Sequence, residues 1–339
     1  MTGSIADTGV MVDAAPVKAV DLANDALRVT LLSHGARIHD VRLAGAEIPL
    51  VAAPRDTARY LDPTWAPFGA IVGPVANRIA LGRARLDGRN LILPRAPNQT
   101  HTLHGGPDGC HTRNWEVDGV SPTAATFTLV VRDGADGFPG NRILAVHYKL
   151  GPGAALTLTM TAMTDAPTWL NLTSHPLWSL DGRSDISGHV LSVAAERFLP
   201  TDDHALPTGE MAAVANTPFD FRHGRPVGPA TTPRLDHNFC LADQSRATPA
   251  SAATLTSAAG LRLSVATTAP GLQVFDAAGF DGDAEAPVGH AGAPLGAFCG
   301  LALEPQGWPD APNRPHFPSV RVAPPATFRQ VTVFRLDRV

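Results

Sequence analysis

The stretch Ala155–Thr161, "ALTLTMT", alternates apolar and hydroxyl side chains along its whole length. In an extended chain Leu156, Leu158 and Met160 fall on one side, and the threonines fall on the other. Threonine favours strands because its branched side chain fits a pleated surface. The pattern therefore predicts a β-strand that buries its apolar face.

Similar strand patterns recur on both sides of this stretch, in "FTLVVR" (127–132), "LRLSVAT" (261–267) and "RQVTVFRL" (329–336). Glycine and proline, 31 of each, are spread along the chain and divide it into pieces mostly shorter than a normal helix. The longest stretch without either residue is Val17–His34, and its Thr30–Leu32 suit a strand better than a short helix. Many short strands joined by turns predict an all-β fold, a large antiparallel β-sandwich.

The chain has 339 residues, of which 44% are hydrophobic, so it suffices for one large β domain or two ordinary domains. No internal repeat and no low-complexity linker interrupts it. We predict a single domain over residues 1–339, with residues 1–16 as a flexible N-terminal extension.

The charge and the cysteines bear on partners and location. A formal net charge of −4 gives no reason to expect nucleic acid or an anionic membrane as a partner. The first residues lack the pattern of a signal peptide, and no apolar run is long enough to span a bilayer. Cys110, Cys240 and Cys299 are odd in number and far apart, which favours a reducing compartment. We expect a cytoplasmic protein.

Thirteen histidines raise the question of a metal site. His101 and His104 in "HTLH" are three residues apart, so on a strand their side chains would face opposite ways. The sequence shows no HExxH, no paired CxxC, no phosphate-binding glycine loop and no GxSxG motif. We therefore expect no metal site and no nucleophilic hydrolase.

The stretch Asn171–Leu180, "NLTSHPLWSL", places His175 directly before Pro176. Proline holds the preceding residue on extended backbone, so the histidine ring is presented to one face of a sheet. Taken alone, His175 is either a core histidine or a proton donor. Glu304 follows the apolar run "GLAL", where a carboxylate is costly to bury unless it is paired or used. One acid and one base on rigid strands can move protons on and off a neutral substrate.

Other short clusters supply polar groups around such a pair. Arg78 lies in "GPVANRIA" (73–80), His104 in "HTLHGG" (101–106) and Asp236 in "LDHNF" (235–239). Each alone could equally stabilise a turn. Together with apolar faces from Trp178 and Trp308, they suit the hydroxyls and the apolar patch of a sugar.

These clusters and the stretch Leu303–Asn313, "LEPQGWPDAPN", in this order, resemble the aldose 1-epimerase (galactose mutarotase) family. The resemblance runs from about Gly35 to the end of the chain. It includes "DGFPGNRILAVHYKL" (136–150), "RFLPTDDHALPTGE" (197–210), "TPFDFR" (217–222), "PGLQVFD" (270–276) and the C-terminal stretch from Trp308. It implies a galactose mutarotase-like supersandwich with few short helices and one sugar cleft on its concave face.

The resemblance also implies an activity, the interconversion of the α and β anomers of a free aldose. His175 matches the general acid and Glu304 the general base. Five further residues match the substrate site: Asn77, Arg78, His104, Asp236 and Gln273. The implied ligand is a small-molecule monosaccharide, without metal or organic cofactor, and the chain would act as a monomer or homodimer. For these roles we expect surroundings that raise the pKa of His175 and keep Glu304 charged.

Three departures from the family pattern bear on which sugar is preferred. Pro74, Ser174 and Leu177 stand where the family commonly has arginine, asparagine and tyrosine. Loss of the tyrosine hydroxyl would remove a partner for a sugar hydroxyl. The alternatives are a non-catalytic carbohydrate-binding protein, an epimerase of a phosphorylated hexose and a purely structural β protein. We expect His101, His111 and His237 at the surface or behind the site, and Trp115 and Trp169 in the core.

Overall fold

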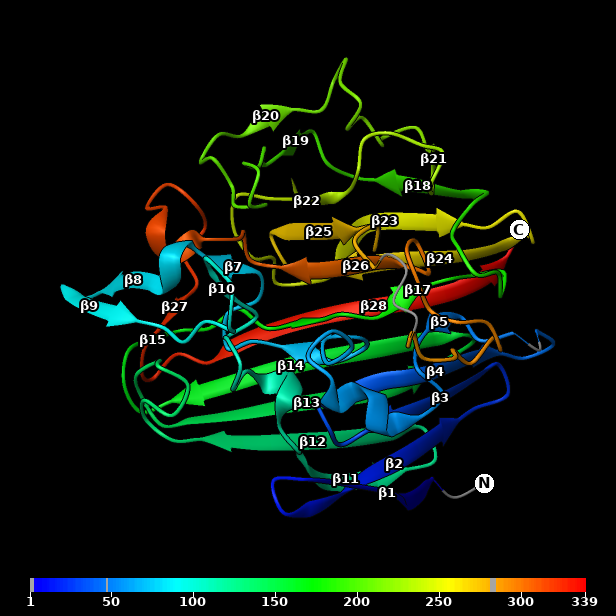
Figure 1. Ribbon diagram of the computed structural model, residues 1–339, viewed down its shortest axis with the longest axis horizontal. Helices are drawn as coiled ribbons and strands as arrows, with labels where there is room; N and C mark the ends of the chain where they lie inside the picture. The colour runs from blue at the N-terminus through cyan, green and yellow to red at the C-terminus, as the bar shows by residue number, and fades with distance from the viewer. Residues whose placement is uncertain (1–2, 47, 281–284) are drawn as a thin grey trace.

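The computed structural model describes residues 3–46, 48–280 and 285–339. Within these ranges the chain forms antiparallel sheets that stack into a sandwich (Figure 1). The helical segments of the described residues are four short 3-10 turns: η1 (Thr57–Leu61), η2 (Ala80–Gly82), η3 (Cys110–Thr112) and η4 (Ala311–Asn313). The predicted all-β sandwich with few short helices is confirmed.

The largest sheet contains all four strands predicted above. Its order is β11 (Glu116–Ser121), β12 (Ala124–Val131), β13 (Arg142–Gly151), β14 (Ala155–Thr164), β28 (Phe328–Arg338), β24 (Leu261–Thr267), β23 (Ala250–Thr256), β18 (His189–Val193) and β21 (Arg225–Val227). In β14 the predicted apolar face is buried, with Leu158 and Met160 fully covered.

A second sheet of seven strands lies against the first. Its order is β20 (Ala212–Ala213), β19 (Arg197–Phe198), β22 (Asp236–Cys240), β25 (Gly271–Phe275), β26 (Leu301–Gln306), β17 (Leu177–Trp178) and β5 (Val51–Ala52). One face packs on the large sheet, in a core that joins Leu272, Val274, Leu301 and Leu303 to Leu158, Leu263 and Phe334. Because side chains alternate along a strand, the other face of β22, β25 and β26 is free to carry a site.

A third sheet at the N-terminus joins β1 (Ser4–Val12), β2 (Ala15–Ala23), β3 (Leu27–Leu32) and β4 (Arg37–Leu43). The breaker-free stretch thus forms strands, as predicted, and Asn24 turns the chain between them by accepting hydrogen bonds from the amides of Ala26 and Leu27. Most of the N-terminal segment, for which we predicted flexibility, pairs with β2 instead. Its Val10 and Val12 pack against a buried cluster that includes Val17 and Leu32, and this packing accounts for the difference.

Four two-stranded pairs complete the fold. They are β7 (Arg78–Ile79) with β10 (Thr102–Leu103), β8 (Arg83–Leu86) with β9 (Arg89–Ile92), β6 (Ile71–Val72) with β16 (Thr173–Ser174), and β15 (Thr168–Trp169) with β27 (Arg321–Val322). Three of these pairs gather with η4 at one end of the sandwich, at the left of Figure 1.

A buried ion pair holds the loop between β12 and β13. Arg142 is fully covered and donates to both carboxylate oxygens of Asp136, with Nη1–Oδ2 at 3.0 Å and Nη2–Oδ1 at 2.7 Å. Its Nε also donates to the carbonyl of Gly140 at 3.0 Å. Removing one partner of such a pair leaves an uncompensated buried charge.

We predict that Asp136→Ala lowers the free energy of unfolding by about 3–5 kcal/mol, because Arg142 stays buried without its counter-ion. Urea denaturation followed by tryptophan fluorescence measures the change. Asp87→Ala, which removes the partner of half-exposed Arg321, is the matched control and should move the midpoint little. Equal effects of the two substitutions would contradict the assignment.

Candidate active site

His175 and Glu304 meet on the free face of the seven-stranded sheet. Glu304 lies on β26, and His175 comes just before β17, the strand that pairs with β26. The backbone of His175 is fixed on both sides, since its N–H donates to the carbonyl of Ala70 at 2.9 Å and its carbonyl accepts from Gly69 N–H at 2.8 Å. This is the extended, rigid backbone that the following proline predicts.

The two side chains form a close and almost dry pair. Nε2 of His175 lies 3.6 Å from Oε1 of Glu304, and the side chains are only 8% and 2% exposed. Neither Oε2 of Glu304 nor Nδ1 of His175 has a hydrogen-bond partner among the described residues. The pair therefore keeps unused hydrogen-bonding capacity in a buried position.

Burial sets the protonation of this pair. Desolvation raises the pKa of Glu304 well above its usual value, helped by the charge of Asp236 and opposed by Arg78. Desolvation lowers the pKa of His175 to about 4. A hydrogen bond to its own backbone and the charge of Asp236 act in the opposite direction and raise this pKa. Our expectation of a raised histidine pKa and a charged glutamate is wrong for this structure, because the cost of removing two charges from water outweighs their mutual attraction.

Three of the predicted binding residues form one chain of contacts beside the pair. Arg78 Nη1 lies 3.3 Å from Oδ2 of Asp236, and Gln273 Nε2 donates to Oδ1 of the same carboxylate at 2.6 Å. Gln273 is also the register partner of Glu304 across β25 and β26. Arg78 and Asp236 remain 21% and 31% exposed, so they form the accessible rim above the buried pair.

Asn77 and His104 are held by the short ladder of β7 and β10. The amide of Asn77 donates to Nδ1 of His104 at 3.1 Å, and the amide of His104 donates to the carbonyl of Asn77 at 3.0 Å. Since Nδ1 accepts, the ring proton of His104 lies on Nε2. Burial lowers the pKa of His104 well below its usual value, with His175 and His111 adding to the effect.

Glycine after His104 allows this ladder to approach the site. Gly105 has φ 87°, and a Cβ there would lie only 2.2 Å from the carbonyl oxygen of Gly73. The ring of His104 consequently sits edge-on to that of His175, with 5.4 Å between centroids. The predicted residues Asn77, Arg78, His104, Asp236 and Gln273 are thus all brought around His175 and Glu304.

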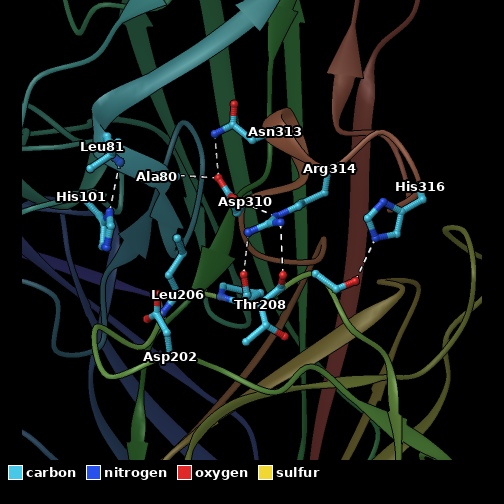
Figure 2. A network of polar contacts seen from close by, with 12 residues as sticks. Ala80, Leu81, His101, Asp202, Leu206, Thr208, Asp310, Asn313, Arg314 and His316 are labelled. Atoms are coloured by element: carbon cyan, nitrogen blue, oxygen red, sulfur yellow. Dashed lines mark hydrogen bonds and ion pairs between the residues drawn. The ribbon is translucent and has the colours of Figure 1, made fainter.

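Asp310, which the sequence reasoning did not select, holds the backbone at Arg78 and Ala80, and Figure 2 shows its contacts with Ala80 and Arg314. Its amide donates to the carbonyl of Arg78 at 3.0 Å, and its carboxylate accepts from the amide of Ala80 at 3.0 Å. Arg314 Nε donates to the same carboxylate at 3.1 Å and reaches carbonyls of Pro207 and Thr208. The available signal was an aspartate enclosed by prolines in "WPDAPN", a sequence typical of a structured turn.

The two tryptophans expected to face the sugar do not do so. Trp178 is fully buried in the core against Phe334, and Trp308 is buried against Phe317 with its Nε1 donating to the carbonyl of Pro270 at 2.9 Å. Leu177 is also fully buried, so this departure from the family pattern offers no surface to a substrate. Alternation along β17 explains Trp178, because it points to the opposite face from Leu177.

The remaining histidines and tryptophans have structural surroundings. His101 accepts from the amide of Leu81 at 3.0 Å, and buried His111 lies behind His104 with ring centroids 6.4 Å apart. His101 and His104 therefore bind two different backbone segments. Trp115 and Trp169 lie in the cores, as expected. Among the described residues, no group of three His, Cys, Asp or Glu side chains could hold a metal ion.

Stacked antiparallel sheets define the class, an all-β sandwich protein, and the free face of one sheet carries a buried carboxyl–imidazole pair. The family model for aldose 1-epimerase matches residues 18–335. The galactose mutarotase of Rattus norvegicus is 34% identical over 332 residues, covering 95% of this chain and 94% of its own. The aldose 1-epimerase of Escherichia coli (strain K12) is 33% identical over 331 residues, with 90% of each chain covered.

A solved structure shows the same fold. The crystal structure of an aldose epimerase homologue from C. elegans superposes with a TM-score of 0.86 at 30% identity, covering 95% of this chain and 99% of the other. The chain belongs to the aldose 1-epimerase family. The predictions of this family, of its isomerase class and of an aldose mutarotase activity are confirmed.

We predict that the stability of the protein falls as the pH is lowered from 7 to 5. Burial lowers the pKa of His34, His39 and His111 to about 3 and that of His175 to about 4. Below pH 6.5 the unfolded chain therefore binds more protons than the folded chain, at a cost of about 2 kcal/mol per buried histidine at pH 5. The raised pKa of Glu304 acts in the opposite direction but is outnumbered.

Thermal unfolding at pH 5, 6 and 7 measures this effect. His39→Gln should reduce the loss between pH 7 and pH 5, because it removes one buried titrating ring. His223→Gln, at an exposed histidine, is the control and should leave the slope unchanged. A midpoint that does not depend on pH would contradict the prediction.

Proposed function

We propose that this chain interconverts the anomers of a free aldose with Glu304 and His175 as its two proton-transfer groups. The observation that carries the proposal is the 3.6 Å contact between these side chains, both nearly covered, on rigid strands beside a polar rim. Ring opening of a pyranose removes a proton from the C1 hydroxyl and adds a proton to the ring oxygen. An adjacent carboxyl and imidazole supply one acceptor and one donor for these steps.

The proposed sequence of steps uses the pair twice. Glu304 takes the C1 hydroxyl proton while protonated His175 gives its proton to the ring oxygen, so the C1–O5 bond breaks and an aldehyde forms. Rotation about C1–C2 presents the opposite carbonyl face. The same two groups then return their protons in reverse as the ring closes to the other anomer.

The pKa directions fit this scheme if the pair is treated as one unit. Burial favours protonated Glu304 and neutral His175, whereas catalysis in the stated direction needs the proton on His175. Both arrangements contain one proton, and the 3.6 Å contact allows it to move between them. We propose that the C1 hydroxyl, by donating to the carboxylate, favours the charged form and moves the proton to His175.

Five residues are proposed to bind the sugar. Asp236 and the side-chain oxygen of Gln273 accept from hydroxyls, whereas Arg78 and Nε2 of His104 donate. Asn77 acts by holding His104 and the backbone of Arg78, since its Oδ1 accepts from the Arg78 amide at 2.7 Å. A mixture of donors and acceptors around a neutral ligand matches a monosaccharide.

A phosphorylated hexose fits the same rim less well. Arg78 is already paired with Asp236, and this carboxylate is the more exposed of the two, so it would repel a phosphate group. A binding protein without catalysis would have no use for two adjacent buried titratable groups that each lower stability. Both alternatives are therefore less well supported than an anomer interconversion.

The cellular compartment and the oligomeric state are also proposals. Cys110, Cys240 and Cys299 are all buried and unpaired, which supports a reducing compartment, and we propose the cytoplasm. None of the helices in the described ranges is long and apolar enough to cross a membrane. We further propose that residues 1–339 act as one domain, in a monomer or homodimer.

We predict that Glu304→Gln and His175→Asn each lower kcat by at least about 100-fold while KM changes far less, because each group acts chiefly in the transition state. Polarimetry of freshly dissolved α-glucose and α-galactose measures the approach to equilibrium rotation. Glu210→Gln and His223→Asn make similar changes at exposed positions and should keep normal activity. Near-normal kcat in Glu304→Gln would show that another group is the base.

Substitutions at the rim should have a different signature. We expect Arg78→Ala and Asp236→Ala to raise KM for every sugar in a panel of hexoses and pentoses, because the lost contacts stabilise the ground state and the transition state alike. Initial rates over a range of sugar concentrations separate KM from kcat. A fall in kcat alone would assign these residues to the chemical step instead.

A further inference from the structure

Two buried amides lie next to the acid–base pair on the same face of the seven-stranded sheet. Gln306 follows Glu304 by two residues on β26, and Asn238 on β22 is the register partner of Gln273. Because side chains two apart on a strand, and register partners on neighbouring strands, share a face, both amides point to the side that carries Glu304. They are 0% and 1% exposed.

All four polar atoms of these amides lack hydrogen-bond partners among the described residues. Oε2 of Glu304 and Oε1 of Gln273 share this property, so six unsatisfied atoms gather on one strip of the sheet. Buried polar groups in proteins are almost always hydrogen-bonded, directly or through ordered water. A strip with this many free donors and acceptors points to a bound polar ligand small enough to be fully enclosed.

Gly271 lets the amide of Asn238 approach Gln306. It is the register partner of Gln306, and a Cβ at this position would lie 2.5 Å from Oδ1 of Asn238 and 2.9 Å from Cδ1 of Trp308. The absent side chain therefore allows the amide of Asn238 to lie over the backbone of β25, on the side of Gln306. Water suits the unsatisfied atoms of the two amides, because it needs two to four polar partners and can both donate and accept.

We propose that Asn238 and Gln306 are positioning residues that hold buried water with their unsatisfied amide groups and, through it, fix the carboxyl group of Glu304. This inference rests on the proposed role of Glu304 as the base. The water bonds to Oε2, which leaves Oε1 facing His175 at 3.6 Å. An amide-bound water can donate to the carboxylate and accept from the carboxylic acid, so it serves both protonation states during the proton transfer.

The water site is tested first in the unmodified protein. A crystal structure at about 1.5 Å should show at least one ordered buried water that contacts both amides or one amide and Glu304. Direct pairing of the Asn238 and Gln306 amides with each other, or an empty space, would overturn the proposal. This measurement does not depend on activity, so it is independent of the proposed function.

The positioning role is tested with three variants. Gln306→Leu and Asn238→Leu remove an amide, and Gly271→Ala keeps both amides but displaces that of Asn238, since the added Cβ would lie 2.5 Å from its Oδ1. We expect each to lower kcat about tenfold, to change KM less than twofold and to move the acidic limb of the kcat–pH profile to higher pH. The limb moves upward because the hydrogen bond from water to the charged carboxylate is stronger than the bond from the neutral acid to water, so its loss favours the acid.

Ser33→Ala serves as the control, since it removes a buried hydroxyl that donates to Oδ1 of Asn114 at 2.7 Å, outside the seven-stranded sheet. It should lower stability without moving the pH limb. The positioning role is overturned if the variants fold, as judged by thermal unfolding, but have the same acidic limb of the kcat–pH profile as the unmodified protein. Failure of the proposed role of Glu304 as the base would give a different result, namely full activity in Glu304→Gln.

Discussion

The burial of one carboxyl group beside one imidazole is the constraint on which the site depends. Glu304 and His175 lie 3.6 Å apart with almost no exposure, so water cannot stabilise a charge on either. Their protonation is then set by each other and by what binds next to them. In the proposed mechanism, this pair shares one proton and acts on a substrate that gives up one hydroxyl proton and takes one proton on its ring oxygen. The half-exposed rim of Arg78 and Asp236 adds polarity without exposing the pair to solvent.

The fold could be predicted from the sequence to a large extent, because alternation is a local signal. The threonine-rich stretch at Ala155–Thr161 and its counterparts each form strands of one sheet, and the glycine and proline distribution excludes long helices. The order of the strands could not be predicted in the same way. The neighbours β14, β28 and β24 come from distant parts of the chain, and their pairing is decided by the packing of whole faces, which no short window contains.

The residues proposed for the site could be named from the sequence, but the electrostatics of His175 and Glu304 could not. The residues taken over from the family resemblance meet around one point. The pKa shifts of His175 and Glu304 nevertheless run against our expectation, because they are set by the burial of both side chains in the folded protein. The same limit explains Trp178, whose aromatic ring suggested a sugar contact but whose position on β17 turns it into the core. Asp310 escaped notice because its role lies in backbone contacts to Arg78 and Ala80.

One strand links the core to the chemistry. On β26, Leu301 and Leu303 face the large sheet, whereas Glu304 and Gln306 face the site. A shift of register by one residue would place both polar groups in the apolar core and both leucines in the site. The hydrophobic packing that stabilises the sandwich therefore also fixes Glu304 and Gln306 in place. Since the polar side chains lower stability where they lie, the register is maintained by the leucines, and the arrangement of the acid–base pair is a consequence of how the two sheets pack.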